Sequence, residues 1–221
     1  MANSSTVLSS PWQQGSDWEY RTQKPKFSPL YLPGIPLFPN GLSRGTIAEI
    51  TGRRSSGRTA CLLHVLAAAT QRGEVCAVVD THNQFDPVSA EAAAVSLSRL
   101  AWIRCSGNVE HAIRATDLLL HASGFGVVHL DLCETPAKHL NKIPLSYWFR
   151  FRRAIESTST ILLVTSESLQ SKSCSATVLT TILKASHWSG APGFRLLREL
   201  RLAASLRKPV FLAPQSLTLA G

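Results

Sequence analysis

The chain has 221 residues, 44% of them hydrophobic and 17% charged, with a formal charge of +9 and a pI of about 9.8. This composition is typical of a globular protein that can bury a full core. The sequence contains no run of about 18 apolar residues, which a transmembrane helix would need. Five cysteines without a CxxC pair favour buried free thiols, and the N-terminus lacks a secretion signal, so we expect a cytoplasmic protein.

In chain order, apolar strands alternate with amphipathic or apolar helices. Residues 1–30 lack such a pattern and predict a flexible N-terminal arm carrying Trp12, Trp18 and Tyr20. The expected strands cover 46–50, 75–80, 102–105, 126–132 and 160–165, and the expected helices cover 59–69, 88–100, 110–122 and 145–155. Because most of these strands are apolar throughout, they predict a mainly parallel sheet covered by helices on both faces. We therefore expect one α/β core domain over 31–210 and a C-terminal tail over 211–221.

The octet from Gly52 to Thr59 has the spacing of a phosphate-binding loop between a predicted strand and a predicted helix. In the intact motif, backbone N–H groups surround the phosphates, a lysine reaches them, and a Ser or Thr hydroxyl binds Mg²⁺. Arg58 stands in place of that lysine, and its planar fork does not reproduce a compact ammonium. The candidate nucleotide-binding residues of this degenerate motif are Gly52, Ser55, Ser56, Gly57, Arg58 and Thr59, together with Asp131 at the end of a later strand. A surface turn rich in Gly, Ser and Arg is the alternative interpretation.

Positive charge is concentrated in the last third of the chain. From Tyr147 onward, ten lysines and arginines stand against three glutamates, which favours a polyanionic partner, although solubility alone would also explain it. The candidate DNA-binding residues are Arg150, Arg152, Arg153, Arg195 and Arg198. The first three are interleaved with aromatic residues that could stack on bases, or could instead pack on the sheet and leave the arginines solvated. The seven histidines have no spacing suited to a metal, and no hydrolase elbow is present.

The segment from Gly41 through Asp131 resembles the nucleotide-binding core of bacterial RecA, with a weaker similarity to about Lys208. The resemblance rests on Asn40–Gly45, on the octet, on Cys76–Asp80 and on the following Phe85-Asp86-Pro87. It implies a RecA-like P-loop NTPase core with a C-terminal β extension, in which Thr180–Trp188 and Arg195–Lys208 form two further strands. Among RecA-like proteins, the short chain and the degenerate loop are similar to the ImuA group, which comprises accessory proteins of bacterial SOS mutagenesis and translesion DNA synthesis.

The departures from RecA define the functional expectation. RecA-type enzymes have a lysine at the position of Arg58, a glutamate general base at that of His82, and a nucleotide-sensing glutamine at or near Glu167. Asp131 matches the acidic residue that organises Mg²⁺, but the two DNA-binding loops, between 133 and 145 and between 168 and 178, are much shortened.

These departures imply a non-catalytic accessory protein in the DNA damage response, for which ATP–Mg²⁺ is a doubtful cofactor. The implied partners are a RecA-family recombinase or a polymerase-like translesion protein, and DNA bound weakly and without sequence preference. A slow DNA-dependent ATPase or a nucleotide-gated switch is the alternative.

Overall fold

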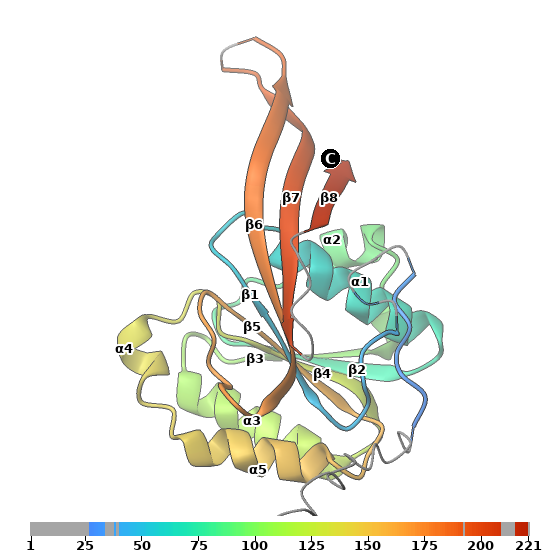
Figure 1. Ribbon diagram of the computed structural model, residues 1–221, viewed down its shortest axis with the longest axis vertical. Coiled ribbons are helices and arrows are strands. Elements are labelled where there is room, and N and C mark those ends of the chain that lie inside the picture. The colour runs from blue at the N-terminus through green and yellow to red at the C-terminus, as the bar shows by residue number, and fades with distance from the viewer. Residues whose placement is uncertain (1–26, 34–37, 39, 192, 209–214, 221) are drawn as a thin grey trace, which may run out of the picture.

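An eight-stranded sheet forms the centre of the computed structural model, which describes residues 27–33, 38, 40–191, 193–208 and 215–220 (Figure 1). The strand order is β3-β2-β4-β5-β1-β6-β7-β8. The strands are β1 (Ile47–Thr51), β2 (Val75–Asp80), β3 (Leu100–Arg104), β4 (Phe125–Asp131), β5 (Ile161–Ser166), β6 (Ser175–Ser189), β7 (Leu196–Lys208) and β8 (Gln215–Ala220). All neighbours from β3 to β6 are parallel, whereas β6, β7 and β8 pair antiparallel.

Helices cover both faces of the parallel part of the sheet. They are α1 (Arg58–Gln71), α2 (Pro87–Ala92), α3 (Val109–Ala122), α4 (Ala137–Leu140) and α5 (Leu145–Ile155), with one 3₁₀ turn over Leu97–Arg99. Helices α1 and α2 lie on one face, and α3 and α5 lie on the other (Figure 1). The predicted α/β architecture is thereby confirmed, including the two additional strands after β5.

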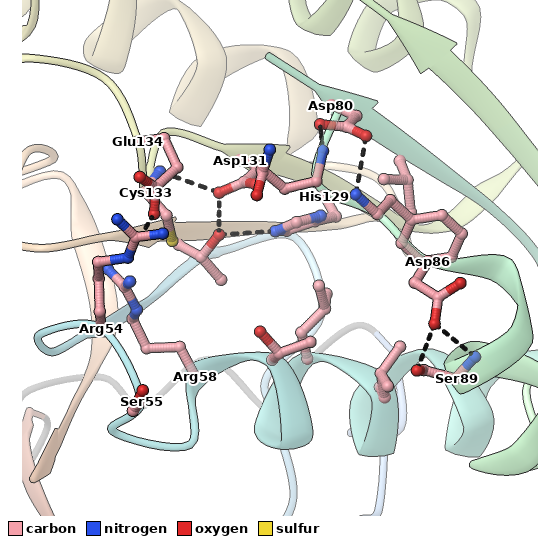
Figure 2. Close-up of a pocket in the computed structure, with 17 residues that line it drawn as sticks. Arg54, Ser55, Arg58, Asp80, Asp86, Ser89, His129, Asp131, Cys133 and Glu134 are labelled. Atoms are coloured by element: carbon pink, nitrogen blue, oxygen red, sulfur yellow. Dashed lines mark hydrogen bonds and ion pairs between the residues drawn. The ribbon is translucent and has the colours of Figure 1, made fainter. Parts of the chain in front are cut away.

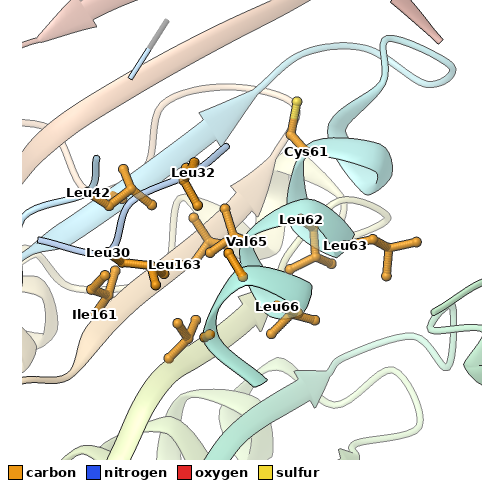
Figure 3. Packing of buried hydrophobic residues seen from close by; sticks show 14 of the residues in the cluster. Leu30, Leu32, Leu42, Cys61, Leu62, Leu63, Val65, Leu66, Ile161 and Leu163 are labelled. Atoms are coloured by element: carbon orange, nitrogen blue, oxygen red, sulfur yellow. The ribbon is translucent and has the colours of Figure 1, made fainter. Parts of the chain in front are cut away.

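Two apolar clusters, one on each side of the sheet, explain why the central strands are apolar throughout. In β5, Ile161 and Leu163 pack toward α1, while Leu162 and Val164 pack toward α3 and α5. Successive side chains of a strand point to opposite faces, so a strand covered twice needs apolar residues at every position. Figure 3 shows the first cluster, in which leucines of α1 meet β5.

The N-terminal arm was expected to reach residue 30, but Leu30 belongs to the core. Its side chain is fully buried (Figure 3), and its N–H and C=O both bond Leu42, at 2.9 and 2.8 Å. Residues 1–26, including Trp12, Trp18 and Tyr20, lie outside the described residues. Strand β8 lies within the expected tail over 211–221.

The helix predicted over 88–100 was wrong in its length, because α2 ends at Ala92. Asp86 begins the helix by accepting hydrogen bonds from the N–H groups of Val88 and Ser89. Ala94 then adopts a positive φ of 65°, which ends the helix and buries Val95 in the cluster that contains α1. Alanine in the left-handed region costs roughly 1–2 kcal/mol, and burying Val95 offsets a cost of that size.

Candidate functional site

The loop between β1 and α1 has the close contacts that require its glycines. A Cβ on Gly52 would lie 2.4 Å from Ser56 Oγ and 2.6 Å from the carbonyl oxygen of Thr181 in β6. Gly57 has a φ of 89°, and a Cβ there would lie 2.1 Å from Leu202 Cδ1 in β7. The Ser56 and Thr181 hydroxyls are 2.8 Å apart. The loop is therefore packed firmly against the first strands of the β extension.

Helix α1 begins at Arg58 and directs its open N-terminus at the space above the sheet. Gly57 precedes it in the left-handed conformation, and no side chain caps the helix. The first N–H groups of an uncapped helix have no intrahelical acceptor, and they attract anions.

A cavity of about 250 Å³ lies over this helix start and the carboxyl ends of β2, β4 and β5 (Figure 2). Its charged and polar lining includes Arg54, Arg58, Asp80, His129, Asp131 and Glu134. Of the loop residues predicted to bind nucleotide, Ser55, Arg58 and Thr59 also line it, and so does Asp131. The other predicted loop residues, Gly52, Ser56 and Gly57, do not line the cavity but contact β6 and β7.

The Arg58 guanidinium is buried beside the cavity, with the residue only 7% exposed. Its Nη1 atom is buried and has no hydrogen-bond partner among the described residues. A buried donor without an acceptor costs roughly 1–3 kcal/mol, and more when it is charged. An oxygen of an anionic group in the cavity would supply the missing acceptor.

Asp131, Thr165 and His129 form a hydrogen-bonded chain along the floor of the cavity. Asp131 Oδ1 accepts from Cys133 N at 2.9 Å and from Thr165 Oγ1 at 3.0 Å. His129 Nε2 lies 2.9 Å from the same Thr165 hydroxyl. Because the single hydroxyl proton goes to Asp131, His129 Nε2 must donate its own proton to Thr165. The other ring nitrogen, Nδ1, is then an acceptor, and it is buried without a partner among the described residues.

His129 is held in its neutral form. Its burial lowers the pKa to about 4, against the opposing effect of the nearby Asp131 and Asp80 carboxylates. Sequence reasoning missed this residue. The available signal was a histidine inside an apolar strand, two positions before Asp131 and therefore on the same face of the sheet.

Asp80 shapes the loop that follows β2. Its carboxylate accepts from the backbone N–H groups of Gln84 and Phe85, both at 2.9 Å, and from Trp102 Nε1 at 3.1 Å. His82, expected at the position of a general base, lies in this loop but does not line the cavity. Asp80 thus stabilises the conformation of this loop, and the three hydrogen bonds occupy most of the acceptor sites of its carboxylate.

Glu49 is a buried carboxylate behind the site. It accepts from Ser166 Oγ at 3.0 Å, from the backbone N–H groups of Gln170 and Ser171 at 2.7 and 3.0 Å, and from Ser171 Oγ. These bonds hold the short loop after β5, in which Glu167 is exposed. The Glu49 carboxylate therefore fixes the backbone conformation of this loop.

The similarity to known proteins covers most of the residues that line the cavity, and Thr165 lies beyond it. Residues 34–139 match the family model of the RecA N-terminal domain. This part of the chain is similar to the N-terminal domain of RecA. Protein RecA of Methylobacterium radiotolerans is 39% identical over 97 residues, which are 44% of this chain and 26% of the relative. Protein RecA of Brucella anthropi and of Brucella suis are each 38% identical over 97 residues, 44% of this chain and 27% of the relative.

The chain thus spans about a quarter of the length of the curated relatives that it matches. The resemblance to RecA is confirmed, and the assignment to the ImuA group stays a prediction. The matched range includes the loop from Gly52 to Thr59, Asp80 and Asp131, whereas α5 and the β extension lie beyond it.

The candidate DNA-binding arginines lie on two separate surfaces, α5 and the β6–β7 hairpin (Figure 1). On α5, Trp148 is only 2% exposed and Phe151 is fully buried, so neither ring can stack on a base. Arg150 Nη2 lies 2.6 Å from Asp117 Oδ2. Trp148 and Phe151 thus pack in the core, whereas Phe149 is 48% exposed beside Arg150 and Arg153.

The cysteine prediction is confirmed, since all five thiols are free and four are buried. Burial raises the pKa of Cys61 to about 11, so this thiol stays protonated at neutral pH. In the described part of the chain, no helix is both long and apolar enough to cross a bilayer.

Proposed function

We propose that this chain is a RecA-like accessory protein that binds partners without hydrolysing ATP, as expected for the ImuA group in translesion DNA synthesis. The observation that carries the proposal is Arg58, a buried arginine in place of the phosphate-binding lysine. His82, in place of the general base, supports the same conclusion because it does not line the cavity.

The other acidic groups of the cavity do not replace the missing base. Asp131 Oδ1 already accepts two hydrogen bonds, and Asp80 and Asp86 accept three each. The Glu134 carboxylate forms an ion pair with Arg54, with its Oε1 atom 3.6 Å from Arg54 Nε. Phosphoryl transfer depends on positioning and charge neutralisation, and each missing group typically removes roughly 3–4 kcal/mol of transition-state stabilisation.

A turnover assay tests this proposal directly. ATP hydrolysis by the full chain, with single-stranded DNA present, should equal that of a Thr59→Ala control, because Thr59 is the expected Mg²⁺ ligand. An Arg58→Lys/His82→Glu double variant introduces the lysine and glutamate of RecA-type enzymes. ATP hydrolysis by this variant alone would show that Arg58 and His82 account for the lack of turnover. DNA-stimulated turnover that Thr59→Ala abolishes would refute the proposal.

A nucleotide-gated switch is the second candidate, and the unpartnered Nη1 of Arg58 favours it. The residues fit phosphate groups, since a buried cation and an uncapped helix start face one cavity. Thr59 and Asp131 would hold Mg²⁺, which would neutralise phosphate charge. The volume of the cavity, about 250 Å³, is below the roughly 300–1,000 Å³ of typical small-molecule sites. Phosphate groups therefore fit it better than a whole nucleotide does. Binding of ATP–Mg²⁺ to the wild type that Arg58→Met abolishes would establish the switch.

The proposed protein partners are a RecA-family recombinase or a polymerase-like translesion protein, engaged through the N-terminal arm independently of ATP. A truncation that tests this must end before Phe27, because Leu30 is part of the core. Removing residues 1–26 should weaken partner binding in a pull-down with purified proteins and leave the thermal unfolding of the core nearly unchanged. If the truncated chain binds as tightly as the full chain, the docking surface is on the core.

A further inference from the structure

The β6–β7 hairpin extends well beyond the helical layers and ends in a turn that projects from the core (Figure 1). We call its outer part, residues 182–191 and 193–201, the distal ribbon. Apolar side chains are exposed along it, namely Ile182, Leu183, Trp188, Phe194 and Leu196. Exposed apolar groups gathered on one projecting element indicate a binding surface.

The turn of the distal ribbon holds an aromatic ring in solvent. Phe194 N–H donates to Ala191 O at 3.0 Å, and Gly193 has a φ of 92°. These are the features of a tight turn whose third residue takes a positive φ. Phe194 is 87% exposed as a result, and Trp188, on the other side of the turn, is 54% exposed. The Trp188 Nε1–H donates to Ser186 Oγ at 3.0 Å, which orients the indole.

The distal ribbon also carries an excess of positively charged side chains. Four lysines and arginines lie between residues 182 and 201, against a single glutamate, Glu199. Glu199 pairs with Arg201 at 2.6 Å, so its charge is already used. Among the described residues, no carboxylate pairs with Arg195 or Arg198. Arg198 Nε donates to Ser189 Oγ at 2.7 Å, which leaves the two terminal nitrogens of its fork for a ligand.

We propose that the distal ribbon binds single-stranded DNA, with the Phe194 and Trp188 rings stacking on bases and the neighbouring arginines contacting phosphates. Charge complementarity selects a polyanion, and the exposed rings select one with unpaired bases. Duplex DNA would satisfy the arginines through its backbone, but it presents no base faces to the rings. This inference deepens the proposed function by naming the surface and the form of DNA.

The first experiment measures binding of a fluorescent thymidine oligonucleotide of about 20 nucleotides, longer than the usual site of one binding module. The full chain is used without nucleotide, and anisotropy is recorded over a range of salt concentrations. Arg195→Gln/Arg198→Gln should weaken binding and reduce the slope of log K against log salt by about 1.4, since each phosphate contact on a single strand contributes about 0.7. Arg150→Gln/Arg153→Gln tests the competing candidate surface on α5, and it should leave the slope nearly unchanged if the distal ribbon is the binding site.

The second experiment separates stacking from charge. Phe194→Ala should weaken binding roughly 5- to 150-fold, the equivalent of about 1–3 kcal/mol for one stacked base. Phe149→Ala on α5 is the matched control, because Phe149 is also exposed, at 48%. Both residues are at the surface, so thermal unfolding of each variant should match the wild type. Wild-type binding should also be weaker to the corresponding duplex.

Three results would overturn the inference: no binding of the oligonucleotide by the wild type, loss of binding in the α5 variants and not in the ribbon variants, or tighter binding to duplex. Displacement of the oligonucleotide by poly-glutamate as readily as by unlabelled oligonucleotide would also overturn it, and would indicate an acidic protein partner. ATP hydrolysis would refute the proposed function without touching this result, because the binding assay contains no nucleotide.

Discussion

His129 should make the stability of the protein depend on pH in a way that one substitution removes. Burial lowers the pKa of His129 from 6.5 to about 4 in the folded chain. An unfolded chain therefore takes up a proton at this residue below about pH 6.5, whereas the folded chain does so only near pH 4. The unfolded state binds more protons in this range, so the free energy of unfolding falls as the pH falls from about 6.5 to about 4.

The size of the effect follows from the difference between the two pKa values. A gap of about 2.5 pKa units corresponds to about 3 kcal/mol. For a chain of this length, that equals a fall in Tm of roughly 6–12 °C. His129→Gln keeps an N–H donor for Thr165 and does not titrate, so its Tm should fall less over the same range.

Thermal unfolding followed by circular dichroism at about pH 7 and about pH 4.5 measures the difference. Carboxylates elsewhere titrate in both proteins, so the comparison between wild type and His129→Gln isolates the histidine. An equal fall in Tm for the two proteins would refute the reasoning, because it would mean that the folded chain accepts a proton at His129 as easily as the unfolded chain does.

Two further substitutions test the support of the site. Glu49→Ala should lower the free energy of unfolding by about 3–5 kcal/mol, since it leaves two backbone N–H groups and the Ser171 hydroxyl without their acceptor; Glu134→Ala, which loses only a 3.6 Å ion pair, should cost under about 1 kcal/mol in the same urea titration. Gly57→Ala should cost about 2–4 kcal/mol, because a Cβ both strains a φ of 89° and meets Leu202. Gly124→Ala is its control, with a φ of 86° and no atom within 4 Å of the added Cβ, and an equal loss in the two variants would show that the contact with β7 is unimportant.

The local parts of the site could be predicted from sequence, because the information for them is local. The apolar patterns on either side of Gly52–Thr59 predicted the strand–loop–helix order of β1 and α1, and the apolar run before Asp131 predicted the strand that ends there. What the sequence could not supply depends on partners distant in the chain. The role of His129 comes from Thr165, 36 residues later. In the same way, Leu30 joined the core only because its backbone pairs with Leu42.

The helix predicted over 88–100 failed for a related reason. Its composition favours helix throughout, but Ala94 O accepts from Gln71 Nε2 at 3.2 Å, and Ser96 N–H donates to Thr70 Oγ1 at 3.1 Å. Contacts with α1 thus outweigh the helical propensity of a few alanines, which amounts to a few tenths of a kcal/mol per residue. Propensity could not show this, because it contains no information on α1.

The contact between Leu202 and Gly57 joins two parts of the protein that would otherwise respond independently. The loop between β1 and α1 lies against β7, and the distal ribbon contains the outer part of that strand. A ligand that displaces the loop would also displace the side chain of Leu202, and a ligand that bends the ribbon would change the contact between Leu202 and the loop. Any resulting change in affinity is reciprocal, because the two binding free energies share one coupling term. Occupancy of the cavity would then affect the distal ribbon through the rigidity of β7.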